Sequence, residues 1–337
     1  MNMKIFHIEQ RPLFKICHSK GFVMDFLQLG ATLYVPATRH DIVEIANQRK
    51  FCSLKSVVFC TEDAILKEEL PDALANLHRS LHQFCRADMM RFIRPRNPQT
   101  LCSLLNLPGI QKIDGFVLPK ATVENLKIYS QLLERHESFW IMITLETEEV
   151  FDPEKMRRMR DVLANAPYKN RILTIRIGGL DLLNILGIRR VCDRTIYDTP
   201  VGHCIYQLVS IFKPLGFNLS APAYECFENF NTLMDEVELD LLNGLFGKTA
   251  IHPQQINFIQ SAYRVSRQDI EMAKAILDSQ SPAVFRMHNI MCEKATHEKW
   301  ARAIIERSKI YGVYEGRDMN LTRNFFDGGK SVAAYQI

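Results

Sequence analysis

Several features that would place a protein in a broad class are missing from this chain of 337 residues. No stretch of about 18 consecutive apolar residues occurs, which argues against a membrane-spanning helix. Residues 1–11 lack the apolar core of a secretory signal peptide, so we expect a cytoplasmic protein. The 42 basic and 38 acidic residues are interspersed along the chain, and this pattern counts against nucleic-acid binding.

The number and spacing of the cysteines also argue against two kinds of structure. Their number, nine, is odd, and no C-x-x-C pair occurs among them. This arrangement indicates neither a disulfide framework nor a zinc knuckle. We therefore expect most of the cysteines to be small, buried apolar residues of a protein in a reducing compartment.

Short apolar segments alternate with longer amphipathic stretches through most of the chain. Eight of these segments have the length of buried strands: Ala31–Val35, Ser56–Cys60, Met90–Arg94, Gly115–Leu118, Trp140–Leu145, Leu173–Ile177, Gly216–Ala221 and Lys248–Ile251. The stretches between them include four with a helical pattern: Asp41–Arg49, Asp72–Phe84, Thr122–Glu134 and Asp152–Ala164. Such alternation is typical of βαβ units and a parallel sheet.

The number of units favours a closed (β/α)8 TIM barrel over an open doubly wound sheet. A G-x-G-x-x-G fingerprint, which would favour a dinucleotide-binding open sheet, is absent. We expect residues 1–30 to form an N-terminal extension and residues 31–280 the catalytic barrel. We expect residues 281–337 to form a C-terminal helical or lid segment, with a helix over His297–Lys309.

Polar residues follow the predicted strands at the positions where a barrel of this type carries its chemistry. They are Glu62, Asp63, Arg94, Arg96, Lys120, Glu146, Asp181 and His252. On one rim, four carboxylates would face three cations. Carboxylate oxygens in small number suit Mg²⁺, and arginine suits the planar carboxylate of a substrate. The pattern predicts a site for an anionic keto acid chelated to a divalent metal, which would stabilise an enolate.

Each of these residues also has a structural alternative. Asp63 and Asp181 could simply cap helices, and Glu146 could belong to a solvated turn. Arg96 could be a surface charge, and His252 could be a structural histidine.

Seven segments occur in an order that can be compared with known families. They are L-Y-V-P-A-T-R at 33–39, T-E-D-A-I at 61–65, R-P-R-N at 94–97, G-F-V-L-P-K at 115–120, L-E-T at 145–147, G-G-L-D-L at 178–182 and G-K-T-A-I-H-P-Q-Q-I at 247–256. Together they resemble the citrate lyase beta-subunit-like family of the aldolase/malyl-CoA lyase group. The last segment is the most specific.

The resemblance implies a (β/α)8 barrel that assembles into homo-oligomers, in trimers or multiples of three. It also implies that Mg²⁺ is held by Glu146 and Asp181, and that Arg94 binds a keto acid or a thioester-linked carboxylate. Glu62 and Asp63 would act with Arg94 in catalysis by orienting metal-bound water. We further expect three residues to contact substrate beside Arg94: Arg96, Lys120 and Gly179.

The leading functional hypothesis is a carbon–carbon bond lyase acting on a keto acid or an acyl thioester such as acyl-CoA. One alternative is hydrolysis of an acyl-CoA thioester at the same metal site, and another is a non-catalytic protein that binds keto acid or CoA. The general acid or base is not assigned. One hypothesis is that Glu62 has this role. Another is that an acidic residue in the C-terminal tail of a neighbouring subunit has it, such as Asp318 or Asp327. The segment after Ser220 (A-P-A-Y-E-C-F-E-N-F) departs from the family pattern, so the substrate stays open.

Overall fold

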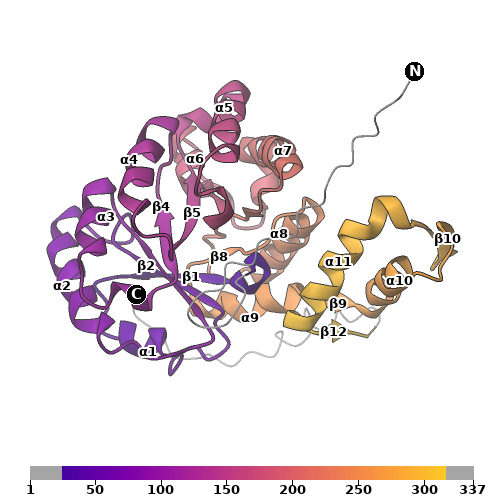
Figure 1. The fold of residues 1–337 in the computed structure, drawn as a ribbon, viewed down its shortest axis with the longest axis horizontal. Coiled ribbons are helices and arrows are strands. Elements are labelled where there is room, and N and C mark those ends of the chain that lie inside the picture. Colours follow the sequence, from indigo (N-terminus) through magenta and orange to yellow (C-terminus); the bar gives the residue numbers. More distant parts are fainter. Residues whose placement is uncertain (1–24, 316–337) are drawn as a thin grey trace, which may run out of the picture.

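The computed structural model describes residues 25–315, and the tail residues Asp318 and Asp327 lie outside this range. Its main body is a barrel of eight parallel strands surrounded by helices (Figure 1). The strands are β1 Thr32–Pro36, β2 Ser56–Cys60, β3 Met90–Arg94, β4 Gly115–Leu118, β5 Trp140–Leu145, β6 Ile172–Ile177, β7 Leu219–Ser220 and β8 Thr249–Ala250. Every predicted strand is present, and the predicted fold class is confirmed.

The strands are hydrogen-bonded in the order β7-β6-β5-β4-β3-β2-β1-β8. The remaining seam is closed by single backbone hydrogen bonds. Phe246 N donates to Leu219 O at 3.0 Å, and Thr249 N donates to Ala221 O at 3.4 Å. The strands beside this seam, β7 and β8, are shorter than predicted, because few backbone hydrogen bonds join them across the seam.

Helices follow the strands in turn and cover the outside of the barrel (Figure 1). They are α1 Ile42–Ala46, α2 Leu70–Leu81, α3 Pro98–Leu105, α4 Val123–Leu133, α5 Pro153–Ala164, α6 Gly179–Ile185, α7 Pro200–Phe212, α8 Phe230–Leu242 and α9 Pro253–Ala262. Local signals place several of their starts, because proline occupies the first turn of α2, α3, α5, α7 and α9. The four predicted helices are confirmed, although α1 is shorter than predicted, since Gln48 turns into the left-handed region.

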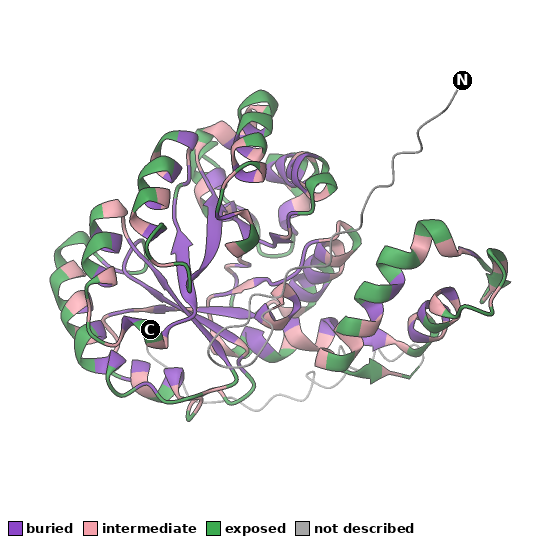
Figure 2. Ribbon diagram, in the orientation of Figure 1, coloured by how far each residue is buried: buried purple, intermediate pink, exposed green. Residues whose placement is uncertain are grey.

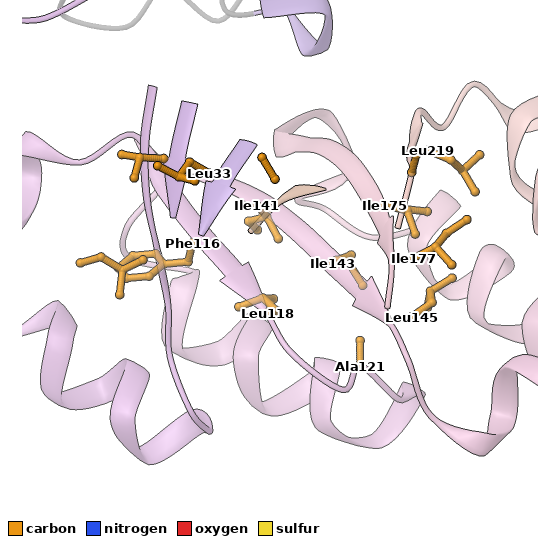
Figure 3. Close-up of a cluster of buried hydrophobic side chains, with 14 of the residues drawn as sticks. Leu33, Phe116, Leu118, Ala121, Ile141, Ile143, Leu145, Ile175, Ile177 and Leu219 are labelled. Carbon is orange, nitrogen blue, oxygen red and sulfur yellow. The ribbon is translucent and has the colours of Figure 1, made fainter. Parts of the chain in front are cut away.

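Alternation along each strand separates two apolar layers. One side, which includes Ile143, Leu145 and Ile175, packs under the helices in the main core (Figure 3). The other side fills the barrel interior with residues such as Phe92 and Met142. Buried residues accordingly run along the strands, while the outer helix faces are exposed (Figure 2). Because the interior is packed, the chemistry of the fold is confined to the strand ends and the layer just beneath them.

The segment that resembles the family most specifically, residues 247–256, fastens the barrel seam. Gly247 lies in the left-handed region at φ +85°, and Gly247 N and Lys248 N both donate to Tyr263 Oη, at 3.2 and 2.9 Å. The fully buried Lys248 Nζ lies 2.8 Å from both Glu236 Oε1 and Asp240 Oδ2 of α8. These contacts give the segment a structural explanation.

The C-terminal part of the described chain forms a separate unit beside the barrel (Figure 1). Its elements are β9 Val265–Ser266, α10 Arg267–Leu277, β10 Val284–Met287, β11 Ile290–Glu293, α11 Lys294–Tyr311 and β12 Val313–Tyr314. It has a hydrophobic cluster of its own, which includes Val265, Ile276 and Ile304. The cluster contains residues on both sides of residue 280, where the boundary was predicted.

The predicted helix over 297–309 is confirmed as part of α11, but the hairpin β10–β11 was not predicted. Its turn residues His288 and Asn289 both have positive φ, at 48° and 64°. A two-residue turn of this kind is usually signalled by Asn-Gly, which the sequence lacks here.

The expectation about cysteines is wrong in two respects. Cys192 and Cys226 form a disulfide with a Cα–Cα distance of 5.7 Å. They lie 34 residues apart, in the chain segments that follow α6 and β7, and only the fold brings them together. In addition, Cys52, Cys85 and Cys102 are exposed rather than buried. Within residues 25–315, no helix is both long and apolar enough to cross a membrane.

Candidate active site

The ends of β2, β3 and β5 bring three buried charges together. Arg94 is the last residue of β3, and Glu62 and Glu146 follow β2 and β5. Arg94 Nη2 lies 2.8 Å from Glu62 Oε2 and 2.8 Å from Glu146 Oε1. Glu62 and Glu146 are 2% and 3% exposed, so these ion pairs are largely shielded from water. The predicted neighbours on one rim are therefore in direct contact.

Lys120 adds a backbone contact as well as a charge. Its φ of 46° is in the left-handed region, which is uncommon for a residue with a side chain and is often found at functional sites. In this conformation Lys120 N donates to Glu146 Oε1 at 2.7 Å, while Asn125 Nδ2 donates to Lys120 O at 2.8 Å. Its ammonium lies 2.6 Å from Glu62 Oε1 and 3.0 Å from Asp63 Oδ2. Lys120 thus both orients Glu146 and neutralises the carboxylates after β2.

Glu146 and Asp181 form the carboxylate pair predicted to bind metal. Asp181 lies in the first turn of α6, directly after β6. Burial raises the pKa of Glu146 to about 7, against the opposing effect of Arg94, and the negative charge of Asp181 acts in the same direction as burial. Burial also raises the pKa of Asp181, and Asp63 adds to this rise. Because the charge of Asp181 raises the pKa of Glu146, a cation between the two carboxylates would stabilise the charged form of Glu146.

The two glycines before Asp181 allow this pair to approach. A Cβ on Gly178 would lie 2.4 Å from Glu146 Cβ and 2.5 Å from Glu146 Oε2. A Cβ on Gly179 would lie 2.6 Å from Ile196 Cδ1 and 2.7 Å from a carbon of Pro222. Gly179, predicted to contact substrate, is thus packed against the loops after β6 and β7. Gly178 was missed, although the Gly-Gly pair was the signal that could have found it.

Arg96 has a structural task that the sequence did not reveal. Its Nε donates to Thr61 O at 3.2 Å, and its Nη2 donates to Glu62 O at 2.7 Å and to Ile65 O at 2.8 Å. Arg96 therefore holds the loop after β2 in place. Arg94, by contrast, faces the carboxylates, so the two arginines that were both predicted to contact substrate have different surroundings.

Asp63 and His252 lie at the margin of the cluster. The Asp63 side chain is half exposed, and its carboxylate pairs with Lys120. His252 is the N-cap residue of α9, where its Nδ1 accepts a hydrogen bond from Gln254 N at 3.3 Å. The structural reading of His252 thus gains support. Cys60 lies at the end of β2, and burial raises the pKa of its thiol, which is therefore a poor nucleophile.

The donor set fits a magnesium ion that keeps part of its hydration shell. Glu146 Oε1 accepts from Arg94 and Lys120 N, which leaves Oε2 as its oxygen for a metal. Within residues 25–315, no three His, Cys, Asp or Glu side chains are grouped so that they alone could hold an ion. Two carboxylates with water and substrate oxygens match the usual coordination of Mg²⁺, which rarely binds through protein ligands alone.

Two further residues lie in the barrel beneath this cluster and were not predicted. Tyr34 is the third residue of β1, and Arg176 is the fifth residue of β6. Arg176 is buried, and its guanidinium lies 5.4 Å from the centroid of the Tyr34 ring. A charged residue within the apolar run I-L-T-I-R-I was the signal for Arg176.

The comparisons with known proteins agree with the barrel fold. The model of a family of C–C bond lyases of the TIM-barrel fold matches residues 24–313. The chain belongs to this family. Curated relatives include (3S)-malyl-CoA thioesterases from strains of Cereibacter sphaeroides. One of them is 24% identical over 246 residues, which cover 72% of this chain and 80% of the relative.

Solved structures share the fold at low identity. A citrate lyase from Burkholderia xenovorans has a TM-score of 0.67 and 13% identity, over 86% of this chain and 95% of the other. The protein CitE from Mycobacterium tuberculosis, solved with magnesium, acetoacetate and coenzyme A, has a TM-score of 0.62 and 16% identity, over 83% and 98%. The citrate lyase beta subunit from the same organism, solved with oxaloacetate and magnesium, has a TM-score of 0.52 and 17% identity, over 72% and 100%.

Proposed function

We propose that this protein is a Mg²⁺-dependent carbon–carbon bond lyase that acts on a keto acid or an acyl thioester through an enolate. The observation that supports this most is the pairing of Glu146 with Asp181 beside Arg94 on one rim of the barrel. Membership of a C–C bond lyase family gives independent support.

In this proposal Glu146 and Asp181 hold the metal, which when bound supplies Lewis-acid stabilisation of negative charge on oxygen. Arg94 binds the substrate carboxylate. Its Nε is buried without a hydrogen-bond partner among the described residues, so the guanidinium retains a donor. A group of this geometry suits a planar carboxylate.

Lys120 and the carboxylates after β2 complete the arrangement. Lys120 holds Glu146 through its backbone N–H. Its side chain is 46% exposed, so its ammonium group is accessible to an anionic substrate. Glu62 and Asp63 are positioned by this ammonium and by Arg94, and they orient water at the site. Arg96 acts through the loop that carries them, and Gly179 acts by keeping the loops after β6 and β7 close.

A thioester hydrolase on the same residues is the second candidate. The curated relatives named (3S)-malyl-CoA thioesterase favour it. The solved structure that contains coenzyme A is consistent with a thioester substrate for either reaction. A non-catalytic protein that binds keto acid or CoA is the third candidate. For all three we propose a cytoplasmic homo-oligomer, a trimer or a multiple of it.

Product analysis with malyl-CoA and Mg²⁺ separates these candidates. A lyase yields two fragments, one of which is still a CoA thioester, whereas a hydrolase yields free CoA and the intact acid. The matched control is Glu146→Gln, which keeps the shape of the side chain and removes its charge. Products that are formed equally by this variant would count against the proposed metal site. Binding of malyl-CoA without any product would favour the third candidate.

A further inference from the structure

A polar layer crosses the barrel interior directly beneath the carboxylates. Thr144, Arg176 and Ser220 are paired in register on β5, β6 and β7. Their chain neighbours, such as Ile143, Ile175 and Leu219, belong to the core between strands and helices (Figure 3). Because side chains alternate along a strand, the three polar residues point into the barrel.

Arg176 is a buried cation without a carboxylate partner. It is 2% exposed, and among the described residues no carboxylate forms an ion pair with it. Its Nη2 donates to Thr249 Oγ1, and its Nη1 is 3.5 Å from Thr32 Oγ1. Burial of an unpaired charge is costly, so its place under the site calls for an explanation.

The hydroxyls beside Arg176 are also unsatisfied. Thr144 Oγ1 and Ser220 Oγ are both buried and have no hydrogen-bond partner in the described chain. Buried polar groups are nearly always paired, in many cases through an ordered water or a ligand. The two hydroxyl groups are therefore available to donate hydrogen bonds to the oxygen atoms of a ligand or a water molecule.

Tyr34 links this layer to the rim. Its ring lies over the Arg176 guanidinium, at 5.4 Å from the centroid. Tyr34 is only partly buried, and its hydroxyl makes no hydrogen bond to any described residue. The phenol also lies within electrostatic range of Arg94 and Glu146. A neutral O–H donor thus lies beside Arg176 and makes no hydrogen bond within residues 25–315.

We propose that Tyr34 is a substrate-contacting residue, whose hydroxyl donates a hydrogen bond to the oxygen of the keto acid on which negative charge develops. Arg176 is its positioning residue and stabilises this charge from beneath the ring. The inference rests on the proposed function and adds to it a preference for substrates with an anionic oxygen directed into the barrel. Fixed donors aimed at developing charge are among the strongest contributors to catalysis.

The test uses oxalate, a planar dianion that resembles the enolate of a keto acid, and isothermal titration calorimetry of the full chain. Tyr34→Phe removes only the hydroxyl. We expect it to raise the Kd of oxalate in the presence of Mg²⁺ by about tenfold or more, as for a lost hydrogen bond to a charged group. The Kd of Mg²⁺ measured without oxalate should not change. Tyr206→Phe, at an exposed position on α7, is the matched control and should bind like the unaltered protein.

Arg176→Met and Arg176→Lys test the positioning role. The Met variant should weaken oxalate binding, and the Lys variant should restore part of the affinity because it retains the charge. A merely structural role would lower the melting temperature of both variants without this rescue.

The possible failures are distinguishable. Tyr34→Phe binding oxalate as tightly as the unaltered protein, while Glu146→Gln loses it, would overturn the role of Tyr34 and leave the proposed function standing. An unaltered protein that binds neither Mg²⁺ nor oxalate would overturn both.

Discussion

Substitution of Gly178 by alanine tests whether close backbone approach builds the metal site. The added Cβ would lie 2.4 Å from Glu146 Cβ and 2.5 Å from Glu146 Oε2, so either Glu146 or the start of α6 must shift. Overpacking of this kind costs about 1–3 kcal/mol of unfolding free energy. The displaced oxygen is the one available to a metal, so we expect Mg²⁺ affinity to fall by tenfold or more.

The control for this substitution is Gly187→Ala, on the loop after α6. Its φ of +66° makes a side chain unfavourable, but a Cβ there would meet no atom within 4 Å. We expect a loss of stability of about 1–2 kcal/mol without a change in Mg²⁺ affinity. Titration calorimetry gives the affinity, and urea unfolding gives the stability. Retention of full Mg²⁺ affinity in Gly178→Ala would refute the reasoning.

Three other predictions follow from the structure. Lys248→Met leaves Glu236 and Asp240 as buried carboxylates without their shared partner, and it should lower the unfolding free energy by about 3–5 kcal/mol in urea titrations; a cost below about 1 kcal/mol would contradict this. Mg²⁺ affinity should weaken as pH falls through about 7, because protonated Glu146 must release its proton to bind metal; calorimetry between pH 6 and 8 tests this, and a flat profile counts against it. Cys192→Ser should lower stability by about 3–4 kcal/mol in oxidising buffer and have little effect in reducing buffer, as thermal unfolding in the two buffers would show.

The fold could be predicted from the sequence because its signals are local. Each strand is a short apolar run, and several helices begin at a proline or a capping side chain. The location of the site followed from one rule, that parallel strands in a barrel place their C-terminal ends on one rim. Glu62, Arg94 and Glu146 lie together for this reason.

The parts that were missed depend on tertiary contacts. The donors of Arg96 point to carbonyl groups of another loop, and no pattern in the sequence predicts these contacts. Lys120 contributes through a left-handed backbone conformation. This conformation cannot be predicted from the sequence, because residues with a side chain rarely adopt it. The disulfide between Cys192 and Cys226 forms because the fold brings two loops together. The role proposed for Arg176 depends on the hydroxyls of Thr144 and Ser220 beside it, which have no hydrogen-bond partner in the described chain.

The ion pairs on the outer side of the seam have a consequence for the loops that follow β6 and β7. Lys248 reaches outward to α8, and Arg190 joins the segment after α6 to Glu236 of the same helix. The loops that follow β6 and β7 are thus tied to each other and to α8 by ion pairs of Arg190 with Glu225 and Glu236. We therefore expect the ion pairs on the α8 side to keep these loops in place when residues on their rim side are substituted.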